Sequence, residues 1–187
     1  MLLKETLRAI ARTQRDDLSQ FEYGVEREKL REIDPGVSLA LIVSGIRRCG
    51  KSTLLRQIAR EVKSFYYFNF EDPRAANFEV QDFQKLDDVF SEEFGKAEYY
   101  FFDEIQNVAK WELFVRALLD RKKHVLITGS NASLLSRELG TRLTGRHLRY
   151  ELFPFSFKEF LKLARKEPDI GTFEEYFRTG GFPEFLK

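Results

Sequence analysis

The chain has 187 residues, 43% of them apolar and 33% charged, and this balance excludes an intrinsically disordered protein. The 31 Lys and Arg residues are balanced by 30 Asp and Glu residues, so net charge does not support binding to nucleic acid or to an anionic membrane. A single cysteine excludes an internal disulfide and a zinc site built from several cysteines. No apolar run of about 18 residues occurs, so we expect no transmembrane helix and a cytoplasmic protein.

The first segment, residues 1–36, is expected to begin as a helix. Leu3, Leu7 and Ile10 fall on one helical face, and arginines occupy other positions around the helix. Those arginines would form either a basic docking surface or an ordinary solvated face. The sequence Asp-Pro-Gly at residues 34–36 is a turn signal that ends the segment.

Strands and helices alternate through the middle of the chain, from residue 37 to residue 153. Short apolar runs predict buried strands, and apolar residues spaced three and four apart predict helices. The strands are expected at 39–43, 65–70, 99–102, 124–128 and 147–152, and the helices at 51–62, 83–94 and 111–119. The last strand alternates in polarity, which is typical of a half-exposed edge. This alternation predicts a three-layer α/β fold around a mostly parallel, five-stranded sheet.

The C-terminal region, residues 154–187, is expected to form short helices. Ser156 to Glu159 and Thr172 to Glu175 each have the spacing of a capping box, and glycines at 180 and 181 would end the second helix. Eight phenylalanines lie between residues 153 and 185. They would pack either as a small helical lid on the sheet or as an interface to further chain, and we expect this region to precede another domain.

A phosphate-binding loop is predicted between the first strand and the helix that follows it. Residues 45–52, GIRRCGKS, match the pattern G-x-x-x-x-G-K-[ST] in the strand–loop–helix context that such a loop requires. Glycines let backbone N–H groups turn toward phosphate oxygens, and the helix N-terminus favours negative charge. Lys51 would contact the β- and γ-phosphates, and Ser52 would bind Mg²⁺. The phosphate-contacting residues are expected to be Gly45, Ile46, Arg47, Arg48, Cys49, Gly50, Lys51, Ser52 and Thr53.

Two further strand ends carry polar residues suited to phosphate chemistry. Asp103 and Glu104 follow an apolar strand, where Asp103 would hold the metal and Glu104 would activate a water molecule. Asn131, with Ser130 in reserve, follows the next strand and would orient that water or touch the γ-phosphate. A helix cap is the alternative role for Asn131.

The order of these elements resembles that of ATPases with an added strand and a catalytic glutamate, a group that includes the AAA superfamily. Within this group, the sequences of the motifs resemble those of the archaeal-type AAA ATPases found across prokaryotes. Members of that family usually carry a C-terminal domain of unknown function. The segments that carry this resemblance are GIRRCGKSTLLRQI, YYFFDEIQNVAKWE, LITGSNASLLS, LTGRHLRYELFPFSFKEFL and TGGFPEFL. Family loops often have an aliphatic residue at the position of Cys49, whose thiol would be either reactive beside the helix N-terminus or simply a small buried group.

The resemblance implies a P-loop NTPase fold and assigns roles to individual residues. Lys51 and Ser52 would be the Walker A residues, Asp103 and Glu104 the Walker B pair, and Asn131 the first sensor. Arg142 and Arg146 match a basic turn, from which an arginine could reach the γ-phosphate of its own chain or of a neighbour. They could equally be surface residues of a loop. The implied partners are ATP, ADP and Mg²⁺, together with a homo-oligomer or a further C-terminal domain.

The sequence therefore predicts Mg²⁺-dependent ATP hydrolysis coupled to conformational change. One alternative is a nucleotide-binding switch that does not hydrolyse. Another is an ATPase regulator associated with nucleic acid, in which the basic residues 121–124 and the arginines at 137, 142, 146 and 149 would contact phosphates. A GTPase is less compatible, because the guanine-reading sequence Asn-Lys-x-Asp does not occur in the chain.

Overall fold

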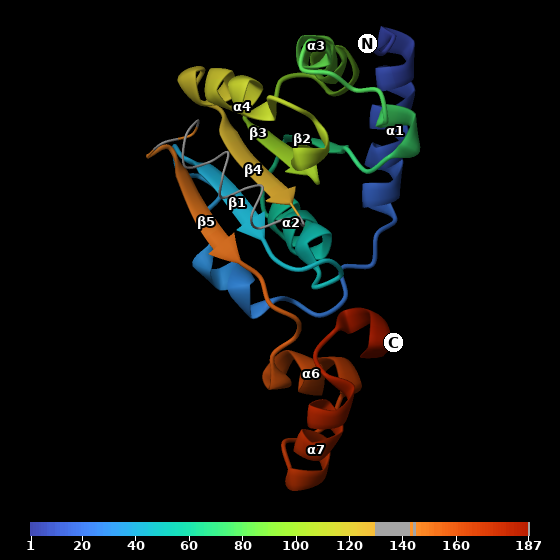
Figure 1. Ribbon diagram of the computed structural model, residues 1–187, viewed down its shortest axis with the longest axis vertical. Coiled ribbons are helices and arrows are strands. Elements are labelled where there is room, and N and C mark those ends of the chain that lie inside the picture. Colours follow the sequence, from blue (N-terminus) through green and yellow to red (C-terminus); the bar gives the residue numbers. More distant parts are fainter. Residues whose placement is uncertain (130–142, 144, 187) are drawn as a thin grey trace.

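A computed structural model describes residues 1–129, 143 and 145–186 of the chain, and five of its strands form one sheet (Figure 1). The strand order is β2–β3–β4–β1–β5, and every neighbouring pair is parallel. The strands are β1 (Ala40–Ser44), β2 (Phe65–Asn69), β3 (Tyr99–Asp103), β4 (His124–Gly129) and β5 (His147–Glu151). The predicted α/β fold with a parallel five-stranded sheet is thus confirmed, including the edge position of the last strand.

Helices follow the strands as their apolar spacing predicts. They are α1 (Lys4–Ser19), α2 (Lys51–Arg60), α3 (Asp82–Phe94), α4 (Trp111–Asp120), α6 (Phe157–Ala164) and α7 (Ile170–Thr179). Short 3₁₀ helices lie at η1 (Glu28–Glu32), η2 (Pro73–Ala75), η3 (Ile105–Asn107) and η4 (Pro183–Leu186). Within the described part of the chain, none of the helices has the length and apolar character needed to cross a membrane.

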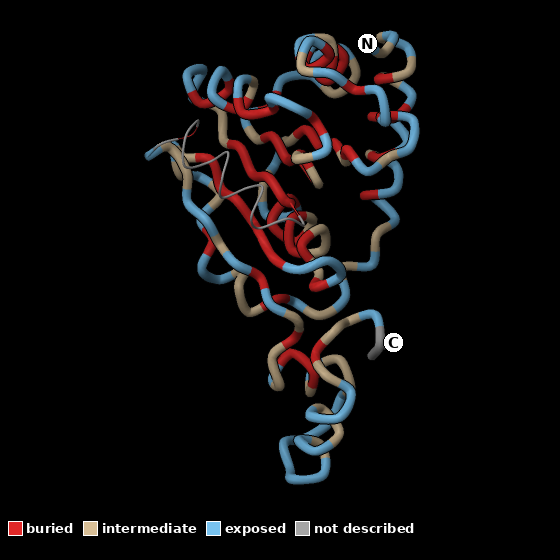
Figure 2. Tube along the Cα trace, in the orientation of Figure 1, coloured by how far each residue is buried: buried red, intermediate tan, exposed pale blue. Residues whose placement is uncertain are grey.

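The sheet separates two hydrophobic cores, because successive strand side chains point to opposite faces. On β1, Leu41 and Val43 pack with α2, whereas Ala40 and Ile42 pack on the face covered by α1, α3 and α4. All five residues of β1 are buried, and Figure 2 shows the inner strands as the most buried part of the molecule. A three-layer arrangement with a fully enclosed central strand is the result.

The arginines of α1 are engaged within the chain. Arg8 lies 2.8 Å from a carboxylate oxygen of both Glu92 and Glu93 on α3, and Arg12 lies 2.5 Å from Glu93. Leu7 and other apolar residues of α1 are buried in the core. The structure therefore favours packing of α1 against α3 over a basic docking surface. The division of the chain at residues 36 and 153 stays a prediction.

The helices α6 and α7 stand apart from the sheet, at the lower end of Figure 1. The predicted capping box of α6 is confirmed, since Ser156 accepts from the backbone N–H of Glu159 and Glu159 accepts from that of Ser156. The predicted box at Thr172 is wrong. The side chain of Asp169 caps α7 instead, and Thr172 is its partner at the third helical position, so the helix begins earlier. Aspartate is a preferred residue at this N-cap position.

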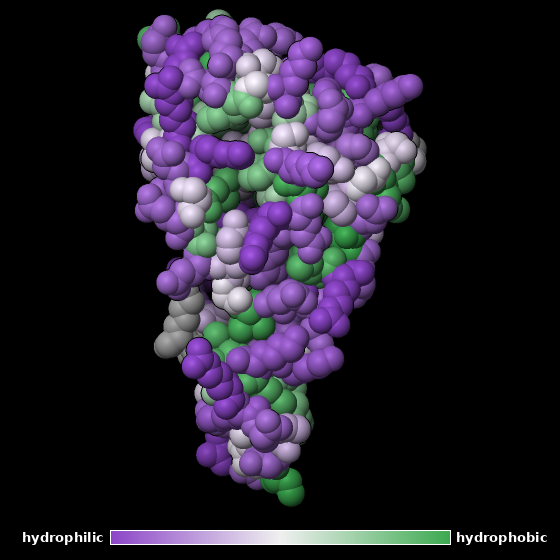
Figure 3. Space-filling view, turned by 180° about the vertical axis from the view of Figure 1, so that it is seen from behind, coloured by the Kyte–Doolittle hydropathy of each residue, from purple (hydrophilic) through white to green (hydrophobic). Residues whose placement is uncertain are grey.

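The surface of α7 is unusually apolar. Ile170 and Phe177 are each 80% exposed, and Figure 3 shows hydrophobic side chains at the lower tip of an otherwise largely hydrophilic face. Phe155 and Phe160, by contrast, are buried. Among the described phenylalanines of this region, some are therefore buried and others are exposed.

Replacement of Phe90 tests the larger core. The ring of Phe90 is 1% exposed and stacks on Tyr66 with a centroid distance of 4.8 Å. Phe90→Ala should lower the free energy of unfolding by about 3–5 kcal/mol, because it removes buried area and leaves a cavity. The matched control Phe177→Ala should change it by no more than about 0.5 kcal/mol. Urea unfolding followed by circular dichroism measures both, and equal effects would contradict the packing described.

Candidate functional site

The loop between β1 and α2 has a backbone that only glycine accommodates at two positions. Gly45 has a φ of +155°, and a Cβ there would lie 2.3 Å from the carbonyl oxygen of Leu152. Gly50 has a φ of +97° and is the N-cap of α2. A Cβ at Gly50 would lie 2.8 Å from Nη1 of Arg27. The loop therefore leads directly into a helix N-terminus, whose unpaired N–H groups favour anions.

Lys51 and Glu104 lie together although they follow different strands. The side chain of Lys51 is 4% exposed; its Nζ donates to the carbonyl oxygen of Ile46 at 3.1 Å and lies 3.7 Å from Oε1 of Glu104. Glu104 follows β3 directly and has a left-handed backbone with a φ of 53°. Its Oε2 accepts a 2.5 Å hydrogen bond from Nε2 of Gln106. The ammonium and the carboxylate thus face one another at the edge of the sheet.

Asp103 is fully buried and is held by three hydroxyl groups. Oδ1 accepts hydrogen bonds from Thr128 and, at 3.1 Å, from Ser52, and Oδ2 accepts from Tyr67 at 3.1 Å. Burial raises the pKa of the Asp103 carboxyl, and the hydrogen bonds from Thr128 and Ser52 oppose that rise. Burial also raises the pKa of Tyr67, so its hydroxyl remains a donor. Neighbouring carboxylate and hydroxyl oxygens are the donors that suit Mg²⁺, and the pair Ser52 and Asp103 fits that ion.

Parallel pairing explains why these residues meet. β4 lies between β1 and β3, so the carboxyl ends of all three strands share one edge of the sheet. Thr128, near the end of β4, accepts the backbone N–H of Glu104 at 3.0 Å in addition to its contact with Asp103. Sequence reasoning missed Thr128 and Tyr67. The only signal for Thr128 was a hydroxyl near the end of an apolar strand.

A cavity of about 450 Å³ opens beside the loop. Its lining includes Lys51, Ser52 and Glu104, together with both loop arginines. Arg47 lies 2.9 Å from a carboxylate oxygen of Glu71. These residues form a polar cavity of mixed charge at the helix N-terminus.

The other loop residues occupy contrasting positions. Arg48 is an exposed residue at the rim and lies 3.1 Å from a carboxylate oxygen of Glu184. Cys49 is fully buried, and burial raises the pKa of its thiol despite the nearby Lys51 and Arg27. The structure therefore favours a space-filling role for Cys49 over a reactive thiolate.

A second cavity of about 230 Å³ adjoins the first. Its walls are largely apolar and aromatic, and they come from the N-terminal segment and from the C-terminal region. They include Phe21, Tyr23, Val25, Phe155 and Leu163. Both cavities are lined by Gly50, Thr53 and Pro183, so they meet at the start of α2. The N-terminal segment, whose position the sequence did not indicate, thus forms a wall beside the phosphate loop.

One of the remaining predicted residues, Arg146, lies away from this cluster. Asn131, its reserve Ser130 and Arg142 lie outside the described residues. The carbonyl oxygen of Arg146 accepts from the backbone N–H of Ala40, at the opposite end of β1 from the loop. The five residues of β1 separate Arg146 from the start of the loop, a distance of about 16 Å.

The side chain of Arg146 is directed to another partner. Its Nη1 lies 2.8 Å from Oδ1 of Asp120, at the end of α4. β5 runs parallel to β1, so it begins at the end of the sheet opposite the phosphate loop. Arg146 therefore does not reach the phosphate loop of its own chain. Contact with a neighbouring chain stays a prediction.

Residues 38–161 match the AAA domain family. An uncharacterized protein of Methanocaldococcus jannaschii is 37% identical over 156 residues, which cover 76% of this chain and 35% of that protein. An uncharacterized protein of Haemophilus influenzae is 38% identical over 165 residues, which cover 78% of this chain and 40% of that protein. The chain thus spans less than half the length of these relatives.

Solved structures show the same fold at low sequence identity. Domain III of the replication initiation protein DnaA from Thermotoga maritima is similar with a TM-score of 0.52 and 18% identity, over 85% of this chain and 76% of that one. AMPPCP-bound DnaA from Aquifex aeolicus has a TM-score of 0.52 and 13% identity, over 95% of this chain and 59% of that one. Together with the match over residues 38–161, these similarities show that the chain belongs to the AAA domain family and has the fold of an AAA-superfamily P-loop ATPase.

Proposed function

We propose that the chain binds ATP with Mg²⁺ and hydrolyses its β–γ phosphoanhydride bond, and that hydrolysis is coupled to conformational change. The observation that carries this proposal is the meeting of Lys51, Ser52, Asp103 and Glu104 at one edge of the sheet. These are a cation, a hydroxyl and two carboxylates beside a helix N-terminus. The similarity to a DnaA structure with bound AMPPCP supports a nucleotide as the ligand.

The phosphate chain would lie along the loop, in the larger cavity. Backbone N–H groups of the first turn of α2 would donate to phosphate oxygens, and Lys51 would contribute its positive charge. Ser52 and Asp103 would hold Mg²⁺, which neutralises charge on the β- and γ-phosphate oxygens when bound. The hydroxyls of Thr128 and Tyr67 keep the Asp103 carboxylate in a fixed orientation toward Ser52.

Glu104 would accept a proton from the attacking water molecule. Its position is fixed from two sides, by the backbone hydrogen bond to Thr128 and by the side-chain hydrogen bond from Gln106. Oε1 of Glu104 lies 3.7 Å from Nζ of Lys51, so this acceptor stands beside the cation expected to contact the phosphates. This arrangement supports hydrolysis over a switch that depends on occupancy alone.

The nucleotide base would occupy the smaller cavity. Its walls are mostly aromatic and aliphatic, and few of the atoms that line it are polar. Such a lining suits a flat, largely apolar ring. Gly50, Thr53 and Pro183 line both cavities, so a ligand with a base and a phosphate chain could span them around the start of α2. This fit accounts for the position of the N-terminal segment beside the loop.

Among the described residues, ion pairs in the basic stretch 121–124 speak against nucleic acid as a partner. Arg121 lies 3.0 Å from Asp87, and Lys123 lies 2.9 Å from Glu98. Two of the basic residues on which that alternative rests are therefore already in ion pairs. Their charge is partly neutralised, which weakens attraction to a phosphate backbone.

Glu104→Gln and Lys51→Ala test the site. Glu104→Gln should bind MgATP with an affinity near that of the unaltered chain, while its turnover falls by about 100-fold or more, because the general base is lost. Lys51→Ala should lose most of its MgATP affinity. Isothermal titration calorimetry and phosphate release, measured on the same samples, check both results.

Glu98→Gln is the matched control, because Glu98 lies directly before β3, where Glu104 lies directly after it. It should leave binding and turnover unchanged. Tight MgATP binding by Lys51→Ala would contradict the site itself. Binding without turnover in the unaltered chain would instead favour the switch.

Leu163→Trp tests the base cavity. The larger side chain should fill the space and weaken MgATP binding by about tenfold or more, since overlap with the base would have to be relieved. Inorganic tripolyphosphate, which lacks a base, should bind as before. Leu113→Trp, on the exposed side of α4, is the control and should change neither affinity. An equal loss for both ligands would place the base elsewhere.

A further inference from the structure

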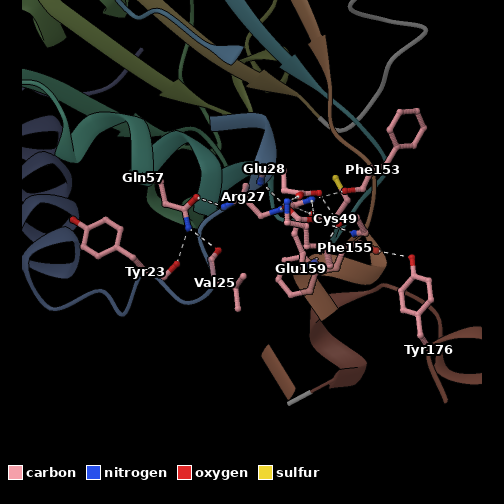
Figure 4. A network of polar contacts seen from close by, with 12 residues as sticks. Tyr23, Val25, Arg27, Glu28, Cys49, Gln57, Phe153, Phe155, Glu159 and Tyr176 are labelled. Carbon is pink, nitrogen blue, oxygen red and sulfur yellow. Dashed lines mark hydrogen bonds and ion pairs between the residues drawn. The ribbon is translucent and has the colours of Figure 1, made fainter. Parts of the chain in front are cut away.

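A buried charged residue from the N-terminal segment contacts the phosphate loop and also lines the smaller cavity. Arg27 is 2% exposed and lies just before η1. Its Nη1 donates to the carbonyl oxygen of Cys49 at 2.6 Å, its Nε to Oε1 of Glu159 at 2.9 Å, and its Nη2 to the carbonyl oxygen of Phe153 at 2.7 Å (Figure 4). One guanidinium thus joins the loop, α6 and the chain that leads into α6.

Glu159 is also almost fully buried, at 3% exposed. Besides Arg27, its Oε1 accepts from the backbone N–H of Glu28 at 2.7 Å, and its Oε2 accepts from that of Ser156 at 2.9 Å. A buried ion pair is tolerated only where further hydrogen bonds compensate for the loss of water, and this pair meets that condition. The capping role of Glu159 therefore accounts for only part of its contacts.

Arg27 is itself held against α2, the helix that begins at the loop. Its backbone N–H donates to Oε1 of Gln57 at 3.1 Å. Nε2 of Gln57 donates to the carbonyl oxygens of Tyr23 and Val25, at 2.9 Å each (Figure 4). Both the backbone and the guanidinium of Arg27 are therefore fixed relative to α2 and the loop.

The contact with Cys49 constrains the peptide bond that links it to Gly50. In a trans peptide the C=O and the N–H point in opposite directions, and the described residues contain no cis peptide. Because Arg27 holds the Cys49 carbonyl on one side, the N–H of Gly50 is directed to the other side. Gly50 could otherwise rotate widely, since glycine has few backbone restrictions.

We propose that Arg27 is a positioning residue that orients the Gly50 N–H toward bound phosphate, and that Glu159 couples this orientation to α6 and α7. The inference rests on the proposed nucleotide site. α6 and α7 would follow as a unit, because the ring of Tyr176 packs on Phe157 and Phe160 with centroid distances of 5.5 and 5.4 Å. The hydroxyl of Tyr176 also donates to the carbonyl oxygen of Phe155, whose ring lies 4.9 Å below the Arg27 guanidinium.

Arg27→Lys and Glu159→Gln test this proposal. Lysine keeps the charge but not the planar fork that reaches three acceptors at once. Glutamine keeps the shape of Glu159 and one acceptor oxygen, so it disturbs packing less than Arg27→Lys does. The Glu159→Gln variant should therefore fold even if the Arg27→Lys variant does not. The matched controls are Arg31→Lys, at a residue with a 75% exposed side chain, and Glu174→Gln on α7, where the side chain is 62% exposed.

Hydrogen exchange without nucleotide is the first measurement. Amides of residues 45–52 should exchange about tenfold faster in Arg27→Lys and in Glu159→Gln than in the controls. MgADP binding by calorimetry is the second, and its dissociation constant should rise about tenfold in Arg27→Lys. The KM for MgATP should rise by a similar factor while kcat changes by less than about threefold, a split that general destabilisation does not produce.

The coupling has its own measurement, the exchange of α7 amides, because α7 lines neither cavity. Saturating MgADP should slow exchange in α7 of the unaltered chain and of both controls, but not in Glu159→Gln. Unchanged loop exchange and MgADP affinity in Arg27→Lys would overturn the positioning role, and a full α7 response in Glu159→Gln would overturn the coupling. If the unaltered chain bound no nucleotide, the proposed function would fail, whereas the loop exchange would still decide whether Arg27 orders the loop.

Discussion

The parallel pairing of β1, β4 and β3 is the constraint on which the rest of the structure depends. Parallel strands direct their carboxyl ends to one edge, so the loop after β1 and the carboxylates after β3 reach the same place. β4 lies between them and contributes Thr128, which contacts both Asp103 and the backbone of Glu104. An antiparallel arrangement would have placed the two motifs at opposite ends of the sheet.

Burial gives this edge its rigidity. Helices cover both faces of the sheet, and each inner strand divides its side chains between two cores. α1 contributes to one of these cores and is fixed by ion pairs to α3, so residues before the loop belong to the framework that supports it. A buried acidic group such as Asp103 is tolerated in this interior because three hydroxyls donate to it.

The C-terminal helices connect to the sheet in a different way. Their contact with the rest of the chain includes the buried pair Arg27 and Glu159, which carries many directed hydrogen bonds in a small volume. Such a contact depends on geometry more than apolar packing does, because a small rotation breaks several bonds together. We expect this property of a contact whose hydrogen bonds change when the phosphate loop changes conformation.

The sequence by itself determined the strands and helices, the loop glycines and the positions of Lys51, Ser52, Asp103 and Glu104, because these depend on short spacings within the chain. Only the tertiary structure decided which distant groups meet. Tyr67 contacts Asp103 across 36 residues, and Arg27 contacts Glu159 across 132. It also decided that Arg146, directly before β5, lies at the end of the sheet opposite the phosphate loop. Strand order and pairing direction are set by long-range packing, which produces no recognisable pattern in the local sequence.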